Sequence, residues 1–207
     1  MKLLVATRNP GKAREIRELL HGLPFEIAFP GELHLERLPE EEALESEGNY
    51  ASNAVAKARY FAERSGLPSC ADDSGIEVDA LGGAPGVHSA RFAAQAAGTD
   101  VDAANNALLL EKLAGVPEER RTARYRCVVA YLQTRAAKPE LVEATCEGYI
   151  LLEPRGSGGF GYDPLFFSSD LQMSFGEAST PAKHRVSHRG RAVRALVEVL
   201  LRRVPQP

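Results

Sequence analysis

Two adjacent carboxylates, Asp72 and Asp73, are the residues of this chain whose types and spacing best suit chemistry. They belong to Ser69-Cys-Ala-Asp-Asp-Ser-Gly-Ile76, which is typical of a short buried strand that ends at the Asp pair. Successive side chains of an extended chain point to opposite faces, so neighbouring Asp residues cannot enter the same core. Two carboxylates at a strand end favour binding of a hard cation such as Mg²⁺, or removal of a proton from water. The alternative is a plain turn, because Asp-Asp-Ser-Gly is also good turn sequence.

A candidate anion site lies near the N-terminus. The segment Thr7-Arg-Asn-Pro-Gly-Lys12 is a predicted strand-to-helix turn, with Asn9 as N-cap and Pro10 as the first helical residue. Free backbone N–H groups and the helix dipole favour an anion there, and Lys12 adds a positive charge. The glycine spacing excludes a Walker loop. The alternative is an ordinary capped helix with an exposed lysine.

Further charged residues surround the second predicted helix. Glu45 and Glu47 precede it, and Lys57 lies two turns into it. A run of glutamates usually covers a solvent-exposed face, so these residues indicate a functional site only together with the other candidates. With the Asp pair and Lys12 they supply carboxylates for a cation and cations for phosphates. That combination favours phosphoryl or nucleotidyl chemistry, in which catalysis depends on positioned charges.

A glycine-rich loop, Gly156-Ser-Gly-Gly-Phe-Gly161, formally matches G-x-G-x-x-G. It is not a dinucleotide fingerprint, because Tyr162-Asp163-Pro164 follows it and a proline disfavours helix at the preceding residue. A loop that presents Phe160 suits a flat aromatic ligand approached closely by the backbone. The alternative is a mobile hairpin loop with Phe160 in the core.

A basic cluster follows, at Lys183-His-Arg-Val-Ser-His-Arg189. It gathers five potentially cationic side chains just before and inside a predicted helix N-terminus, where cations oppose the helix dipole. A locally unfavourable arrangement with no visible compensation often indicates a functional site. The alternative is a solvated basic turn.

The elements that must position these residues alternate between strand and helix. The expected elements are a buried strand over residues 3–6, a helix from Pro10, a strand over 25–29, a helix from about Asn49, the strand of the Asp pair with a further piece over 76–78, a helix capped by Thr99 or Asp102, strands over 123–131 and 142–150, and a last helix capped by Ser187. Ile16, Leu19 and Leu20 form the inner face of the first helix, and Glu15 lies outside. The strands 123–131 and 142–150 are expected to pair as a hairpin. The pattern predicts an α/β fold with a mixed sheet, as one domain over residues 1–207.

The composition bounds the class of protein. The chain has 207 residues, 44% of them hydrophobic and 26% charged, which is typical of a soluble globular protein. Its net charge of −3 argues against bulk binding to nucleic acid or to an anionic membrane. Three cysteines without a C-x-x-C pair favour neither zinc nor disulfides and predict a reducing cytoplasm. No apolar run reaches transmembrane length.

The chain resembles the inosine triphosphate pyrophosphatase family, whose members remove non-standard purine triphosphates. The matching segments, in the family's order, are Ala6-Thr-Arg-Asn-Pro-Gly-Lys12, Asn53-Ala-Val-Ala-Lys-Ala58, Ala71-Asp-Asp-Ser-Gly75, Gly82-Gly-Ala-Pro-Gly-Val-His-Ser-Ala-Arg91, Gly158-Gly-Phe-Gly-Tyr-Asp-Pro164 and Ser187-His-Arg-Gly190. The resemblance implies a long mixed sheet flanked by helices, two lobes with a central cleft, Mg²⁺ dependence and a homodimer. It implies hydrolysis of ITP, dITP and XTP to the monophosphate and pyrophosphate.

The resemblance also implies roles for individual residues. Asp73 would be the catalytic base, and Glu45, Asp72 and Asp73 would bind the metal, with Glu47 or Glu42 as substitutes for Glu45. The residues implied for substrate binding are Thr7, Asn9, Lys12, Lys57, Ser74, Phe160, Gly161, Tyr162, Asp163, Lys183, His188 and Arg189.

Two other functions compete with this one. A pyrophosphatase of the Maf family, with a similar fold, would prefer pyrimidine or modified dTTP-like substrates, but the Phe160 loop and the Ser187-His188-Arg189 turn favour a purine. A nucleotide-binding regulator without catalysis would need no paired carboxylate beside its phosphates. Asp72, Asp73, Lys12 and Lys57 are all present, which favours an enzyme.

Overall fold

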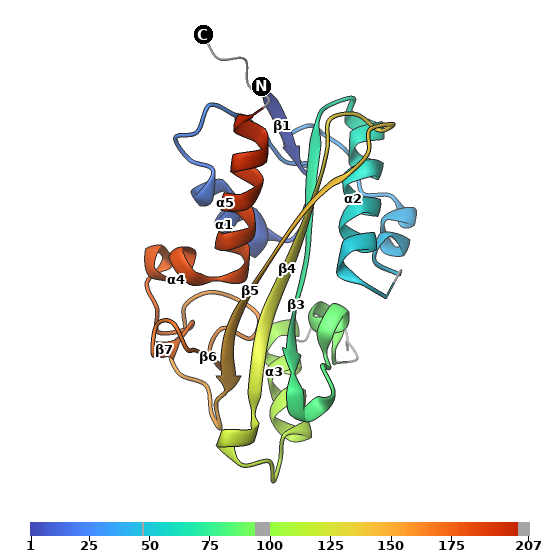
Figure 1. The fold of residues 1–207 in the computed structure, drawn as a ribbon. Coiled ribbons are helices and arrows are strands. Elements are labelled where there is room, and N and C mark those ends of the chain that lie inside the picture. Colours follow the sequence, from blue (N-terminus) through green and yellow to red (C-terminus); the bar gives the residue numbers. More distant parts are fainter. Residues whose placement is uncertain (47, 94–99, 203–207) are drawn as a thin grey trace. The chain divides into compact units, whose positions relative to one another are not determined.

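The computed structural model describes residues 1–46, 48–93 and 100–202. Its strands are β1 (Lys2–Val5), β2 (Glu26–Ala28), β3 (Ser69–Val78), β4 (Thr122–Leu132), β5 (Glu140–Ile150), β6 (Phe166–Ser168) and β7 (Met173–Ser174). They form a seven-stranded sheet in the order β2-β1-β3-β4-β5-β6-β7 (Figure 1). β1 is parallel to β2 and β3, whereas β6 is antiparallel to β5 and β7. The predicted α/β fold with a mixed sheet is confirmed.

The helices connect these strands and cover them. They are α1 (Pro10–Leu19), α2 (Tyr50–Ser65), α3 (Val101–Lys112), α4 (Thr180–Val186) and α5 (His188–Leu201), with 3-10 helices at Pro39–Glu45, Asp79–Leu81, Gly86–Arg91 and Glu118–Arg120. None of the helices in the described ranges is long and apolar enough to cross a bilayer. The chain divides into two compact units. Unit 1 comprises Met1–Asp73, Cys127–Ala144 and Arg189–Pro207, and unit 2 comprises Ser74–Arg126 and Thr145–His188.

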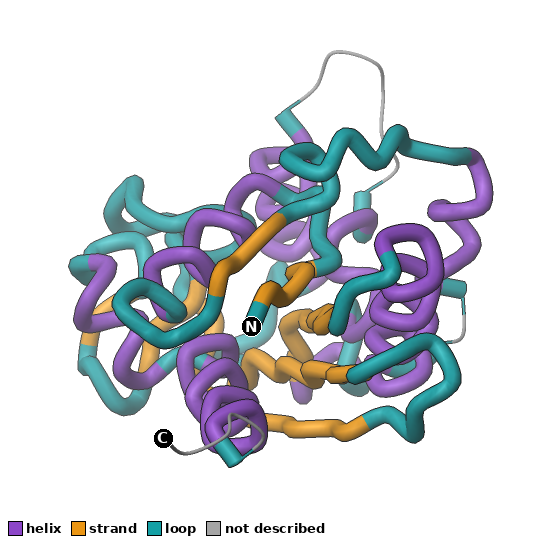
Figure 2. Tube along the Cα trace, turned by 90° about the horizontal axis from the view of Figure 1, so that it is seen from above, coloured by secondary structure: helices purple, strands orange, loops and turns teal. Residues whose placement is uncertain are grey.

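Unit 1 has helices on both faces of its strands, as the tube in Figure 2 shows. Because side chains alternate along a strand, β1, β3 and β4 each contribute to two separate cores. The core under α1 and α5 includes Leu3, Val5, Ile16, Cys70, Cys127, Val129, Val193 and Leu196. The core under α2 includes Leu4, Ala6, Ala54, Ala58, Phe61, Ala71, Ala130 and Leu132. A residue's position in the alternation therefore decides which helices it meets.

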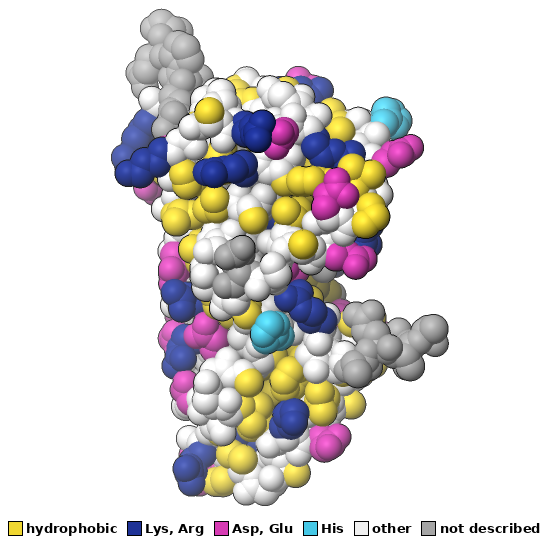
Figure 3. Space-filling view, turned by 90° about the vertical axis from the view of Figure 1, so that its right-hand side faces the viewer, with side chains coloured by type: hydrophobic (Ala, Val, Ile, Leu, Met, Phe, Trp, Pro, Cys, Tyr) yellow, Lys and Arg dark blue, Asp and Glu magenta, His cyan; other side chains and the backbone are white. Residues whose placement is uncertain are grey.

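Unit 2 packs α3 and α4 on a third core. That core includes Ile76, Val78, Leu109, Leu113, Tyr125, Cys146, Phe166 and Phe175, with Val186 packed against it. On β4 and β5, the residues that alternate with the core residues include the charged side chains Arg124 and Glu147. Arg124 contacts Asp79 at 3.1 Å and Glu147 at 3.2 Å. The molecular face in Figure 3 likewise mixes Lys and Arg side chains with Asp and Glu side chains.

The structure corrects the prediction that the Asp pair ends its own strand. β3 runs unbroken from Ser69 to Val78, so Asp72 and Asp73 lie near its middle. The neighbouring strand β1 ends instead, because its last paired residue, Val5, lies opposite Cys70. The carboxylates therefore follow the carboxyl end of a parallel strand, which is where ligands bind in open α/β sheets.

Three further expectations about the helices need correction. Glu15 is buried, with 5% of its surface exposed, although the sequence placed it outside. α4 was not expected as a helix. The side chain of Asp100 caps α3, and Asp102 lies inside the first turn. The other suggested cap, Thr99, lies outside the described residues.

Candidate active site

Asp73 is buried on the α2 face of unit 1 and is held by two side chains of that helix. The amide of Asn53 donates to Asp73 Oδ2 at 2.9 Å, and Lys57 Nζ donates to Asp73 Oδ1 at 3.1 Å. Asn53 and Lys57 are four residues apart, so they lie one turn apart on the same helix face. Asn49 caps α2 by accepting from the backbone N–H of Ser52. The helix thus fixes the carboxylate of Asp73 from two directions.

Lys57 also joins Asp73 to Glu45. Its Nζ lies 2.7 Å from Glu45 Oε1, at the end of the 3-10 helix that precedes α2. Burial lowers the pKa of Lys57, but attraction to Asp73 and Glu45 outweighs burial and the net pKa is raised. The ammonium is therefore charged at neutral pH. Two carboxylates converge here on one cation.

Asp72 points to the other face, under α1 and α5. Its Oδ2 lies 3.0 Å from Lys12 Nζ and 3.4 Å from a nitrogen of Arg189. Arg189 in turn donates to Glu15 Oε2 at 2.6 Å. Burial alone would raise the pKa of Asp72, but Lys12 and Arg189 hold it well below its usual range. Asp72 is thus the ionised centre of a buried charge network.

The first turn of α1 has the predicted geometry. Asn9 Oδ1 accepts from the backbone N–H of Lys12 at 3.0 Å, and Pro10 is the first helical residue. Thr7 Oγ1 accepts from the N–H of Asn9 at 3.2 Å. Thr7 is half-buried and Asn9 is exposed, so both residues face solvent beside the positive end of a helix.

Lys183 and Phe160 lie together in unit 2. Lys183 is buried and forms an ion pair with Asp163 Oδ2, the oxygen that also accepts from the backbone N–H of Phe160 at 2.8 Å. Its Nζ lies 5.2 Å from the centre of the Phe160 ring, within cation–π range. Gly159 permits this approach, because an added Cβ would lie 2.0 Å from Asp163 Oδ2. One half-exposed aromatic ring therefore sits beside one buried ammonium.

His188 and Tyr162 belong to the core of the same unit. The His188 ring stacks on Tyr125 at 4.5 Å, with 8° between the planes. The Tyr162 hydroxyl donates to the Ser89 carbonyl at 2.8 Å, and burial raises its pKa. Ser74, the first residue of unit 2, is half-buried.

Comparison with known proteins identifies the family to which the chain belongs. The sequence model of the Ham1 family matches residues 3–199. The chain belongs to the Ham1 family. A dITP/XTP pyrophosphatase of Geobacter sulfurreducens is 48% identical over 200 residues, covering 96% of both chains. One of Desulforamulus reducens is 46% identical over 203 residues, covering 98% of this chain and 96% of the relative. The solved structure of a HAM1 protein from Coxiella burnetii is 34% identical, with a TM-score of 0.84 over 98% of this chain and 99% of that one.

In this Ham1 chain nine of the predicted site residues form three groups. The groups are Glu45, Lys57 and Asp73; Lys12, Asp72 and Arg189; and Phe160, Asp163 and Lys183. Asp72 and Asp73 belong to different groups, because they point to opposite faces of one strand. Of the alternatives to Glu45, Glu42 is exposed and Glu47 lies outside the described residues.

Sequence reasoning missed several residues of the site. Asn53 was quoted only as part of a motif, although a polar residue one turn before Lys57 on a buried helix face could have indicated its role. Glu15 was missed because its partner lies 174 residues away in sequence. Asp102 and Asn106, which contact Gly161, carry no local signal that distinguishes them from ordinary helix residues.

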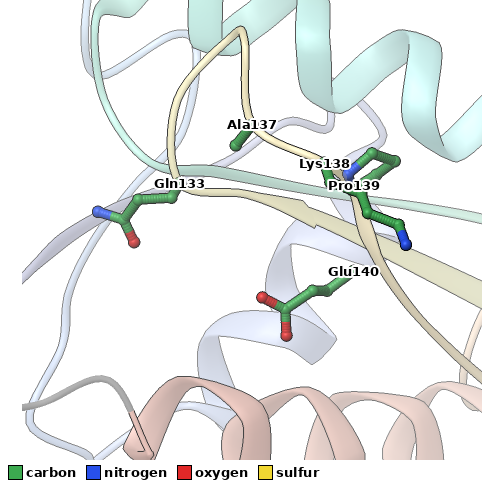
Figure 4. A pocket seen from close by; sticks show the side chains of 5 residues that line it. All are labelled: Gln133, Ala137, Lys138, Pro139 and Glu140. Atoms are coloured by element: carbon green, nitrogen blue, oxygen red, sulfur yellow. The ribbon is translucent and has the colours of Figure 1, made fainter.

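The described ranges contain no cluster of three His, Cys, Asp or Glu side chains that could hold a metal ion by itself. A depression of about 560 Å³ lies on the β4–β5 connection (Figure 4). It is lined by Gln133, Ala137, Lys138, Pro139 and Glu140. These residues belong to none of the three groups, so we assign the depression no role in the site.

Proposed function

We propose that this chain hydrolyses non-standard purine nucleoside triphosphates, namely ITP, dITP and XTP, to the monophosphate and pyrophosphate. The reaction would remove these nucleotides from the nucleotide pool. The proposal is carried by Asp73, a buried carboxylate held by Asn53 and Lys57 beside Glu45. Relatives that share nearly half of this sequence are named dITP/XTP pyrophosphatases.

Glu45 and Asp73 suit a divalent cation. Carboxylate oxygens are the ligands that Mg²⁺ prefers, and the Lys57 ammonium already shows that both side chains can converge on one positive charge. We assign the metal to these two residues. Asp72 was implied as a third ligand, but its partners Lys12 and Arg189 neutralise it on the other face of the strand. When bound, Mg²⁺ would stabilise the negative charge that develops on the phosphates.

Asp73 would act as the general base on the attacking water. A carboxylate has about four acceptor positions, and the hydrogen bonds from Asn53 and Lys57 use two of them. The remaining lone pairs are free to accept a proton or to bind a cation. Because α2 fixes the side chain, its orientation is set before the substrate arrives.

Lys12 and Lys57 would bind the triphosphate as point charges, with Thr7 and Asn9 adding polar contacts at the helix N-terminus. The salt bridge from Lys12 to Asp72, 3.0 Å long, would hold the ammonium in place. The same proposal gives Arg189 a supporting role, since Glu15 and Asp72 occupy its donors.

The purine base would stack on Phe160 and receive hydrogen bonds from Lys183. Gly161, Asp163 and Ser74 complete the set expected to surround the nucleoside. Tyr162 and His188 would support these residues from the core, since the Tyr162 hydroxyl is bonded to Ser89 and the His188 ring is stacked.

We further propose that residues 1–207 act as one domain and that the protein works as a homodimer in the cytoplasm. The family match across residues 3–199 supports one domain. Cys70, Cys127 and Cys146 are buried and form no disulfide in the described residues, which suits a reducing compartment.

The direct experiment identifies the products and the metal requirement. Purified protein is incubated with ITP and Mg²⁺, and the products are separated by ion-exchange chromatography. We expect IMP and pyrophosphate in equal amounts, with no release of inorganic phosphate, and loss of the reaction with excess EDTA. Release of IDP and phosphate would contradict the proposed bond cleavage, and full activity in EDTA would contradict the metal assignment.

A further inference from the structure

Gly161 follows Phe160 and, as a glycine, has the greatest backbone freedom of any residue type. Its φ is +63°, in the left-handed region that glycine tolerates best. An added Cβ would meet no atom within 4 Å, so the requirement for glycine is conformational and not steric. A glycine in a loop also has the greatest freedom to leave this conformation.

One face of α3 holds both backbone polar groups of Gly161. Asp102 Oδ2 accepts from the Gly161 N–H at 2.6 Å, and the Asn106 amide donates to the Gly161 carbonyl at 2.9 Å. The two residues are one turn apart, so their side chains reach out from the same face. Asp100 caps the helix by accepting from the N–H groups of Asp102 and Ala103. The carboxylate of Asp102 is therefore not needed as the cap.

The residues on either side of Gly161 are fixed by other partners. The N–H of Phe160 donates to Asp163, and the hydroxyl of Tyr162 donates to the Ser89 carbonyl. The Phe160 carbonyl accepts from the Asp163 N–H at 3.4 Å, a long hydrogen bond that holds the Phe160–Gly161 peptide plane only weakly. Without contacts from α3, the two peptide planes that flank Gly161 could therefore rotate. Such a rotation would turn the Phe160 ring.

We infer that Asp102 and Asn106 are positioning residues for base recognition. By holding Gly161 in its left-handed conformation they aim the Phe160 ring, and keep it beside the Lys183 ammonium. The inference rests on the proposed function only for the identity of the base. The holding of Gly161 is a property of the protein without nucleotide.

The test compares four variants. Asp102→Ala removes the acceptor, and Asn106→Ala removes the donor and introduces a residue that favours helix. Asp102→Asn retains an acceptor oxygen and serves as the conservative rescue. The matched control is Asp100→Asn, which removes one negative charge from the same helix terminus but keeps a good N-cap residue. Thermal unfolding of each variant identifies any that fail to fold.

The first readout is amide hydrogen exchange of Gly161, measured by NMR without nucleotide. We expect exchange in Asp102→Ala to quicken by at least about tenfold, since a hydrogen bond to a charged acceptor shifts an equilibrium by roughly that factor or more. Asp100→Asn should exchange like the wild type. Unchanged exchange in Asp102→Ala would overturn the inference.

The second readout is kcat/KM for ITP and for ATP. For both Ala variants we expect the ITP-over-ATP ratio to fall about tenfold through KM for ITP, with kcat within about threefold of wild type. Asp102→Asn should recover most of the ratio. Faster Gly161 exchange with an unchanged ratio would also overturn the inference. A wild type that does not prefer ITP would instead refute the proposed function, and the exchange measurement would still decide whether Asp102 and Asn106 hold Gly161.

Discussion

At the scale of residues, we propose different roles for two neighbouring aspartates because their side chains point to opposite faces of one strand. Asp73 meets α2, where Asn53 and Lys57 orient it beside Glu45. Asp72 meets α1 and α5, where Lys12 and Arg189 neutralise it. In this proposal Asp73 takes part in the chemistry, and Asp72 holds Lys12 and Arg189 in place.

Asp73→Asn should keep the fold and bind nucleotide, yet lose at least about 100-fold in kcat, because general-base catalysis contributes about 10²–10⁴-fold. Steady-state kinetics with ITP, and a binding titration with a non-hydrolysable analogue, measure the two effects. The control is Glu40→Gln, an exposed residue of the same 3-10 helix as Glu45. If Asp73→Asn kept more than about a tenth of the wild-type turnover, Asp73 would not be the base.

Asp72→Asn should instead lower the free energy of unfolding by about 3 kcal/mol, since it removes the carboxylate partner of the half-buried Lys12 and one of the carboxylate partners of the buried Arg189. Its effect depends on pH. The pKa of Asp72 is lower in the folded protein than the unfolded value of 3.8, so its contribution is present above that value and is lost as pH falls.

Denaturant unfolding between pH 7 and pH 3 checks this dependence. The difference between wild type and Asp72→Asn should be full at neutral pH and shrink in acid. The control is Glu198→Gln, an exposed residue of α5, which should change stability little at any pH. A difference that grew as the pH fell would contradict the sign of the pKa shift.

At the scale of elements, the sequence predicts those features of helices and strands that depend on neighbouring residues. Asn9 and Pro10 start α1 as expected. The apolar spacing of α5 likewise predicts an inner face of Val193, Leu196, Val197, Leu200 and Leu201; the first four pack in the core, whereas Leu201 is exposed. Glu15 could not be placed, because its burial depends on Arg189 at the far end of the chain. α4 has seven residues, too few for a helical period to show. The continuity of β3 past Ser74 depends on its partners in the sheet, which the local turn sequence does not reveal.

Gly148 shows how an element can depend on the absence of a side chain. A Cβ there would lie 2.1 Å from the Phe167 carbonyl and 2.7 Å from the Phe166 ring, in the β5–β6 pairing. Gly148→Ala should destabilise the protein by about 1–3 kcal/mol or more. Gly31→Ala is the control, because nothing lies within 4 Å of its added Cβ. Chemical denaturation compares the two, and equal stability would mean that β6 shifts without cost.

At the scale of the whole molecule, the homodimer is a separate prediction. Multi-angle light scattering at micromolar concentration should give twice 22.4 kDa. The expectation rests on the family resemblance. A mass near 22.4 kDa across the concentration range would contradict it.

The central claim is that the protein selects the 6-oxo purines that do not belong in the nucleotide pool. The Lys183 ammonium has only donors, so it can pair with a 6-oxo group, whereas the 6-amino group of adenine would face it with hydrogens. Mismatches of this kind can reach a factor of about 10⁴ in a site built for hydrogen bonding. Phe160 can stack on any purine, so stacking alone selects none of them; the position of its ring beside Lys183 decides how the stacked base meets the ammonium.

The most direct measurement is kcat/KM for ITP, XTP, GTP and ATP, from pyrophosphate release with Mg²⁺ present. We expect strong preference for ITP and XTP over ATP, and clear preference over GTP, which keeps the 6-oxo group but adds a 2-amino group. Comparable values for ATP and ITP would contradict it and would indicate a general nucleotide pyrophosphatase.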